Sequence, residues 1–269
     1  MSRFIPRLLT ASCVVMLLGG AVAAQQSKPF EPEVGQAGKD VVWVPTAQAL
    51  VDRMLDMAKV TPQDYVIDLG SGDGRTVITA AKRGAKTMGI EFNPDMVALS
   101  KKNAIAAGVG EKAVFVQGDI FASDFKQATV ITMFLLPDLN LRLRPILLTM
   151  KPGTRVVSNS FDMAEWQPDQ EISAQGQCET YCRAMLWIIP AKVEGNWKLG
   201  RGELRLVQNF QNVSGTFVGT GGGTPISEGK MSGAEISFKA GERTYKGKVN
   251  GNMMEGTVSD GGTWQARRI

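Results

Sequence analysis

The chain has 269 residues, of which 43% are hydrophobic and 21% are charged, and its formal net charge at pH 7 is +4. This composition excludes an intrinsically disordered chain, and the length allows one large domain or two modest ones. The sequence contains no histidine, which excludes Ser-His-Asp and Cys-His catalysis and any histidine-ligated metal site. Lysines and arginines are scattered without interleaved aromatic residues, so nucleic acid is not expected as a partner.

Residues 1–24 have the pattern of a secretory signal peptide. Arg3 and Arg7 make a positive region, residues 8–20 an apolar core, and the small residues up to Ala24 a cleavage site. We expect cleavage near this site and an exported chain, periplasmic or secreted. The alternative is an uncleaved segment that anchors the protein in a membrane, although the apolar stretch is short for a span.

The next segment, residues 25–40, is polar with Pro and Gly and predicts an extended arm. A first globular domain is expected over residues 41–190. Near its start, Thr46 is placed to cap a helix that precedes the first strand and leans over a ligand crevice. The apolar residues of this helix recur at helical spacing and are Leu50, Met54, Met57 and Ala58.

A glycine-rich turn follows the first predicted strand, Tyr65–Leu69. The turn has the pattern G-x-G-x-G over residues 70–74 and opens into a predicted helix over residues 76–82, so the backbone N–H groups of the helix start face a ligand. It departs from the dinucleotide pattern G-x-G-x-x-G, and Asp68 precedes the first glycine. A carboxylate here would repel a pyrophosphate but suits a ligand with ammonium and sulfonium charges. A tight structural turn without a ligand is the alternative.

Two further acids follow predicted strands. Glu91 ends the strand at residues 86–91 and lies about twenty residues after the turn, the spacing at which an acid meets ribose hydroxyls. Asp119 follows the apolar run at residues 113–116. In an open α/β sheet the ligand crevice lies at the carboxyl ends of the strands, so we expect these two acids to meet Asp68 there. For Glu91 alone, a solvated acid at a strand end is the alternative.

The run D-L-G-S-G-D-G at residues 68–74 resembles motif I of the class I S-adenosylmethionine-dependent methyltransferases. The run M-K-P-G-T at residues 150–154, before a predicted strand, is another recurring feature of that family. The resemblance covers about residues 41–190 and implies an α/β fold with a Rossmann-like seven-stranded sheet, and S-adenosyl-L-methionine as the cofactor. The cofactor-binding residues that it implies are Asp68, Gly70, Ser71, Gly72, Asp73, Gly74, Glu91, Phe92, Asp119 and Ile120.

A fourth strand is expected over residues 128–136, followed by a helix over residues 139–150. By resemblance to class I enzymes, the methyl acceptor approaches at the end of this strand. Asp138 is the candidate general base and Asn140 its orienting partner, while a strand exit and helix cap is the alternative. The candidates to line the acceptor pocket are Trp43, Thr46 and Pro137, although Trp43 could equally belong to the core.

The set of V-P-T before a helix, D-L-G-S-G-D-G-R and a strand-end L-P is similar to the lysine methyltransferases of the ATP-synthase c subunit and the adenine nucleotide translocase, with their bacterial relatives. The N/D-P-P-Y/F motif of methyltransferases that act on bases or glutamine is absent. The resemblance implies a protein-lysine N-methyltransferase acting on an envelope or membrane protein. The alternatives are a methyltransferase of a small molecule and an exported, non-catalytic binding protein on this fold. The oligomeric state is left open.

Residues 171–190 are expected to supply the last strands of the sheet as an antiparallel pair. Removal of the signal peptide would take away Cys13 and leave Cys178 and Cys182. Two cysteines in an exported protein fit one disulfide, and two unlinked buried thiols are the alternative. A C-x-x-x-C pattern without further ligands is a poor zinc site.

Residues 193–269 differ from the preceding domain in composition and pattern. Glycine is frequent, and short runs that alternate between apolar and polar residues recur about every ten residues. They predict a small antiparallel β domain, a meander or a barrel, with a flexible loop at Gly219–Gly223. Trp197 and Trp264, near its two ends, are expected to share one core. Stabilisation or substrate contact is the expected role, because the domain carries no catalytic constellation. The six runs are 203–208, 213–218, 234–238, 244–249, 253–258 and 263–267.

Overall fold

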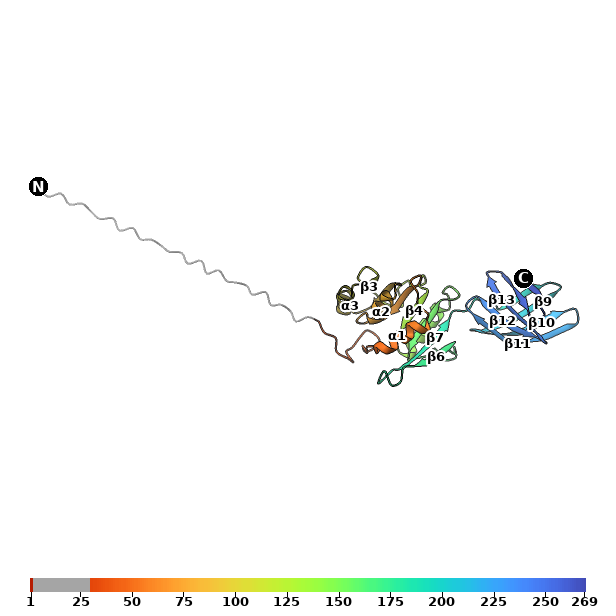
Figure 1. Ribbon diagram of the computed structural model, residues 1–269, viewed down its shortest axis with the longest axis horizontal. Coiled ribbons are helices and arrows are strands. Elements are labelled where there is room, and N and C mark those ends of the chain that lie inside the picture. The colour runs from red at the N-terminus through yellow and green to blue at the C-terminus, as the bar shows by residue number, and fades with distance from the viewer. Residues whose placement is uncertain (2–29) are drawn as a thin grey trace. The chain divides into compact units, whose positions relative to one another are not determined.

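The computed structural model describes Met1 and residues 30–269 (Figure 1). The predicted signal peptide, apart from Met1, and the first part of the predicted arm lie outside the described residues. The remainder forms one compact unit, Pro32–Ile269. Within the described part of the chain, no helix combines the length and the apolar character needed to cross a membrane.

The first half of this unit is a seven-stranded sheet in the order β3-β2-β1-β4-β5-β7-β6. Strands β1 to β5 are parallel, and β7 pairs antiparallel with both β5 and β6, which confirms the methyltransferase-type sheet and its final antiparallel pair. The strands are β1 (Tyr65–Leu69), β2 (Lys86–Glu91), β3 (Ala113–Gln117), β4 (Val130–Met133), β5 (Arg155–Asn159), β6 (Gln170–Ser173) and β7 (Arg183–Ile188). The helices are α1 (Gln48–Met57), α2 (Arg75–Lys82), α3 (Pro94–Ala106) and α4 (Pro137–Leu147).

Successive residues of the strands supply opposite faces of this sheet, as the two-residue period of a strand requires. On β1, Ile67 and Leu69 belong to one buried cluster with Leu143 of α4. Val66, on the opposite face of the strand, belongs to a second cluster with Leu55 of α1. The central strands are therefore covered on both faces, and ligand access is left at their carboxyl ends.

Two local expectations differ from the structure. Ala47, not Thr46, is the N-cap residue of α1, and no side chain caps the helix. The Thr46 hydroxyl instead accepts a hydrogen bond from Nδ2 of Asn159 at 3.1 Å, so a tertiary partner has replaced the local cap. Helix α4 begins at Pro137, two residues earlier than expected, because proline is well suited to the first helical position.

The second half of the unit is a closed eight-stranded antiparallel barrel, which confirms the small β domain. Its core contains both Trp197 and Trp264. Two strands, β8 and β11, were not expected, and the predicted loop Gly219–Gly223 is the tight turn of the β10–β11 hairpin. The strands are β8 (Gly195–Leu199), β9 (Gly202–Asn209), β10 (Asn212–Gly219), β11 (Gly222–Ser232), β12 (Glu235–Ala240), β13 (Arg243–Asn250), β14 (Met253–Val258) and β15 (Thr263–Arg268).

The barrel packs against the sheet domain through the β9–β10 turn. The rings of Trp166 and Phe210 stack with centroids 5.5 Å apart, and Nε2 of Gln211 donates to the carbonyl of Gln167 at 2.7 Å. Trp166 is fully buried and belongs to the core of the sheet domain. The barrel thus covers one end of that core.

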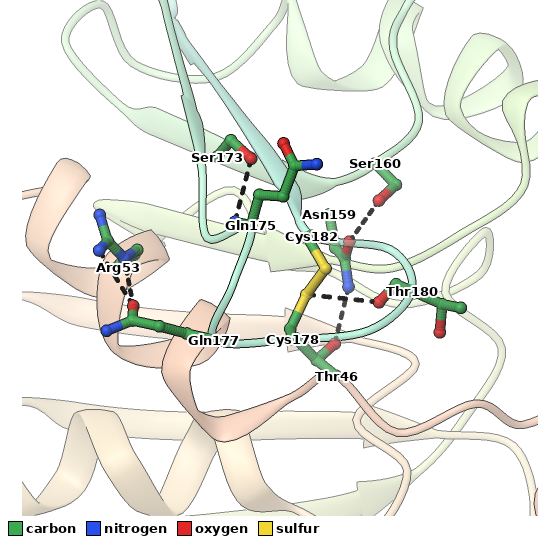
Figure 2. Close-up of a disulfide and its surroundings, with 10 residues drawn as sticks. All are labelled: Thr46, Arg53, Asn159, Ser160, Ser173, Gln175, Gln177, Cys178, Thr180 and Cys182. Carbon is green, nitrogen blue, oxygen red and sulfur yellow. Dashed lines mark hydrogen bonds between the residues drawn. A yellow bond between two sulfur atoms is a disulfide. The ribbon is translucent and has the colours of Figure 1, made fainter.

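A disulfide joins Cys178 and Cys182 in the connection between β6 and β7 (Figure 2). This agrees with the disulfide interpretation of the two cysteines rather than with two free thiols. The closed loop is short, and its residues 178–182 return the chain directly into β7.

Candidate active site

One cavity lies at the carboxyl ends of the parallel strands and brings together most of the residues predicted from the sequence. The predicted residues that line it are Trp43, Thr46, Asp68, Gly70, Ser71, Gly72, Asp73, Glu91, Phe92, Asp119 and Ile120. The described part of the arm, from Gln36 onward, forms a further wall. Gly74, Pro137, Asp138 and Asn140 do not belong to the lining.

The glycine turn is held in place by backbone contacts on both sides. The N–H groups of Gly70 and Ser71 donate to the carbonyl of Ile90 at 2.9 and 3.1 Å, so the turn is tied to β2. Gly72 has a positive φ of 53°, and a Cβ there would lie 2.6 Å from Nε1 of Trp43. Glycine at this position therefore lets Trp43, which follows the arm, close on the turn.

Gly74 serves the fold rather than the cavity wall. It is the N-cap residue of α2 with a φ of 84°, and a Cβ would lie 2.7 Å from Cζ of Phe115. The third glycine of the pattern thus allows close packing of α2 on β3.

Asp68 is buried at the end of β1 and accepts a hydrogen bond from the Thr132 hydroxyl at 2.7 Å. Burial, with smaller contributions from the carboxylates of Glu91 and Asp73, raises the pKa of Asp68 to about 7 against the opposing effect of the Thr132 bond. A buried carboxylate of this kind favours a cation as its partner, because a nearby positive charge stabilises its ionised form.

Both oxygens of Glu91 are fixed by the backbone. Oε2 accepts from the N–H of Gly72 and Oε1 from the N–H of Asn93, each at 2.9 Å. Each carboxylate oxygen can accept more than one hydrogen bond, so capacity is left for two hydroxyl donors. The carboxylate is therefore pre-oriented and can accept hydrogen bonds from a vicinal diol such as that of a ribose.

Asp119 is linked to the arm. Its Oδ2 accepts from Nζ of Lys39 at 2.8 Å, and its Oδ1 accepts from the N–H of Phe121 at 2.9 Å. These two hydrogen bonds lower the pKa of Asp119 below its ordinary value. Lys39 also lies 5.4 Å from the centre of the Phe92 ring, so one cation connects two predicted cofactor residues with the arm.

The donor set of the cavity fits S-adenosylmethionine. Asp68 suits its positive charges, and the two oriented oxygens of Glu91 suit its ribose. The buried hydroxyl oxygen of Ser71 lines the cavity and has no hydrogen-bond partner among the described residues, so it is available to a polar ligand group. No cluster of three potential metal ligands occurs in the described part of the chain.

Thr46 of the predicted acceptor pocket lines the cavity, whereas the two candidate catalytic residues lie elsewhere. Asp138 is exposed in the first turn of α4. Asn140 is fully buried, and its Nδ2 donates to the carbonyls of Phe161 and Asp162 at 3.0 and 3.1 Å. Asn140 thus ties α4 to the segment after β5. The helix-cap alternative does not describe these two residues either, because Leu136 is the N-cap residue of α4 and no side chain caps the helix.

Several residues that line the cavity or support its walls were not predicted from the sequence. Thr132 lies in the apolar strand β4, and its hydroxyl donates to Asp68 on the neighbouring strand. This role becomes visible only once the two strands are paired. Lys39 lies in the arm, whose sequence has no helical or strand periodicity from which its position could be predicted. The aromatic rings of Phe134, Phe161 and Tyr181 come from three separate segments that meet only in the folded sheet.

Comparison with known proteins identifies relatives of the sheet domain. A model of the ANTKMT methyltransferase domain matches residues 68–170. A protein-lysine N-methyltransferase of Saccharolobus islandicus (strain REY15A) is 44% identical over 138 residues, which cover 50% of this chain and 86% of that protein. The adenine nucleotide translocase lysine N-methyltransferase of Mus musculus is 32% identical over 130 residues, 48% of this chain and 56% of the mouse enzyme.

A solved structure supports the same assignment. The crystal structure of an RNA methyltransferase from Salinibacter ruber in complex with S-adenosyl-L-homocysteine is 47% identical with a TM-score of 0.53, and the match covers 56% of this chain and 96% of that one. The two proteins share the fold of the sheet domain. The S-adenosyl-L-homocysteine bound in that protein agrees with the donor set described above for this cavity. The chain therefore belongs to the family described by the ANTKMT methyltransferase domain, and it is an S-adenosylmethionine-dependent methyltransferase.

Proposed function

We propose that the protein is a protein-lysine N-methyltransferase. The observation that carries the proposal is the 44% identity to a protein-lysine N-methyltransferase, 86% of which this chain covers. The cavity agrees with this acceptor, because its half beyond the acids is lined by apolar side chains such as Met133, Leu135 and Leu139.

The chemistry of methyl transfer to lysine suits such a wall. When bound, S-adenosylmethionine would supply a sulfonium-linked methyl carbon that a neutral amine could attack in line, with the sulfur of S-adenosylhomocysteine as the leaving group. The side chains must therefore remove water from the arriving ammonium group and align it. An apolar environment lowers the pKa of a lysine amine and so favours its neutral form. Alignment alone can contribute on the order of 7 to 11 kcal/mol, so a dedicated base is not required.

We further propose that the protein is exported and that its acceptor is an envelope or membrane protein. The signal-like N-terminal sequence and the disulfide between Cys178 and Cys182 support export, because disulfides persist in oxidising compartments. Retention by an uncleaved N-terminal segment is the alternative.

The experiment is methyl transfer from radiolabelled S-adenosylmethionine to a cell-envelope protein fraction and to total RNA, followed by mass spectrometry of the labelled products. We expect methyllysine in protein, loss of labelling with Glu91→Gln, and full labelling with Glu111→Gln, an exposed control. Label in RNA or in a small molecule alone would contradict the lysine assignment while leaving the methyltransferase assignment intact.

A further inference from the structure

Three aromatic rings meet where the second half of the sheet ends. Phe134 follows β4, Phe161 follows β5 and Tyr181 precedes β7, and all three line the cavity. The ring centres of Phe134 and Tyr181 are 5.2 Å apart, edge to face, and Phe161 lies 6.1 Å from Phe134 and 5.9 Å from Tyr181. These separations are those of interacting aromatic pairs. We name Phe134, Phe161 and Tyr181 the aromatic cluster.

The aromatic cluster and the cofactor acids divide the edge of the sheet between them. Asp68, Glu91 and Asp119 lie at the ends of β1, β2 and β3, or just beyond them. The aromatic cluster lies at the carboxyl ends of β4 and β5 and at the start of β7. The end of β5 and the start of β7 lie side by side, because Asn159 pairs with Ala184 in the antiparallel register. The acids account for the charged and ribose parts of the cofactor, so the aromatic half is left for the acceptor.

Tyr181 is held in the cluster by the disulfide loop. It has a positive φ of 55° and an exposed fraction of 45%, a conformation and a position that a free loop would not maintain for a tyrosine. The disulfide joins Cys178 to Cys182, the residue next to Tyr181, and the Cys182 carbonyl accepts from the N–H of Ala174 at 2.7 Å.

The other end of the loop is fixed to helix α1. Nε and Nη2 of Arg53 donate to Oε1 of Gln177 at 3.1 and 3.0 Å (Figure 2). The loop is thus anchored to the sheet on one side and to α1 on the other.

We propose that the aromatic cluster is the acceptor subsite, which binds the ammonium group of lysine and of its methylated products, and that the disulfide loop positions Tyr181 in it. The faces of Phe and Tyr rings attract ammonium groups, and methylated ammonium groups are bound in this way by clusters of aromatic rings. This inference rests on the proposed lysine specificity. It adds a specificity element, because Tyr181 and the disulfide lie outside the residues 68–170 matched by the family model.

The test compares two probe peptides in the presence of S-adenosyl-L-homocysteine. One carries Nε-trimethyllysine, and the other carries the neutral tert-butyl isostere of the same shape. We expect the cationic peptide to bind the oxidised protein about 2- to 30-fold more tightly, the range of one cation–π contact. Tyr181→Ala should reduce this preference, because it removes one of the three rings, while Tyr181→Phe and the neighbouring control Glu179→Gln should keep it. Equal binding of both peptides, no binding of either at millimolar concentration, or an unaltered preference in Tyr181→Ala would overturn the subsite.

A second measurement addresses the disulfide. In Cys178→Ser/Cys182→Ser, and in the wild-type protein under dithiothreitol, KM for a lysine peptide should rise while the affinity for S-adenosyl-L-homocysteine stays constant. Lysine methylation with an unchanged KM in Tyr181→Ala would overturn the subsite alone and leave the proposed function standing. Methylation of an RNA oligonucleotide with a KM that depends on Tyr181 would assign the cluster to base stacking and overturn both. Cation preference without lysine methylation would support the subsite and overturn the proposed function.

Discussion

Replacing Asp68 by Asn should stabilise the fold and weaken the cofactor site. The carboxyl group is buried, and its pKa lies near 7 instead of the ordinary 3.8. The folded state therefore holds this proton more tightly than the unfolded state does. Stability from this group is fully present below pH 3.8 and is lost as the pH rises towards 7, at a cost of about 4 kcal/mol above pH 7.

Asn keeps the acceptor for the Thr132 hydroxyl and removes the charge, but its buried amide donors need partners, at a cost of about 1 to 3 kcal/mol. We therefore expect Asp68→Asn to be more stable than the wild type by about 1 to 3 kcal/mol at pH 8. This corresponds to about 2 to 4 °C in Tm for each kcal/mol. At pH 4 this stability advantage of Asp68→Asn should be lost or reversed, because Asp68 is then neutral in the folded state.

The matched control is Asp64→Asn, next to the start of the same strand. Although burial alone would raise its pKa, hydrogen bonds from Thr129 and the Thr61 N–H, together with the Arg155 guanidinium, lower the pKa of Asp64. Breaking this largely buried ion pair should destabilise the fold by about 3 kcal/mol.

The assay is thermal unfolding followed by circular dichroism at pH 8 and pH 4, together with titration by S-adenosylmethionine. Cofactor affinity of the wild type should fall as the pH drops below 7, since a protonated Asp68 no longer attracts a cation, and Asp68→Asn should bind weakly at every pH. An Asp68→Asn protein that is less stable than the wild type at pH 8 would refute the reasoning about its charge.

Three further predictions concern the walls of the cavity. Gly72→Ala should reduce cofactor affinity and destabilise the fold by about 1 to 3 kcal/mol in chemical denaturation, because the added Cβ meets Trp43 at a positive φ; wild-type behaviour would contradict the close approach. Asn140→Ala should lower stability by about 1 to 3 kcal/mol yet keep kcat in the folded protein, since its amide supports two backbone carbonyls; lost kcat with intact stability would restore it as a catalytic residue. Lys39→Ala should speed the dissociation of S-adenosyl-L-homocysteine by up to about fivefold in stopped-flow measurements and leave Tm unchanged, because its ion pair with Asp119 is exposed and holds the arm. An unchanged rate would show that this contact does not restrain the arm.

The sheet and the meeting of Asp68, Glu91 and Asp119 at its edge could be predicted because their signals are local. Strand β1 follows directly from the apolar run Tyr65–Leu69, and the glycine turn determines what comes after it. Glu91 and Asp119 could be placed because parallel strands bring their carboxyl ends to one edge. Each of these inferences needs only a short stretch of sequence and a general rule of sheet geometry.

What the sequence did not reveal depends on partners far away in the chain. The Thr46 hydroxyl serves Asn159 instead of a helix cap, and Asn140 serves backbone carbonyls about twenty residues onward instead of the cavity. Strand β11 carries Pro225 and a register shift between Ser227 and Lys230, so its alternation is broken and only its neighbours in the barrel define it. Side chains with two plausible partners cannot be assigned from spacing alone.

The most direct test of the account is calorimetric titration of the purified protein with S-adenosyl-L-methionine and S-adenosyl-L-homocysteine, alongside Glu91→Ala. We expect micromolar binding of both ligands by the wild type and its loss in Glu91→Ala, which should remain folded with a lowered Tm because the N–H groups of Gly72 and Asn93 lose their acceptor. Binding of equal strength by a folded Glu91→Ala protein, or no binding by a folded wild type, would contradict the assignment of the cavity as the cofactor site.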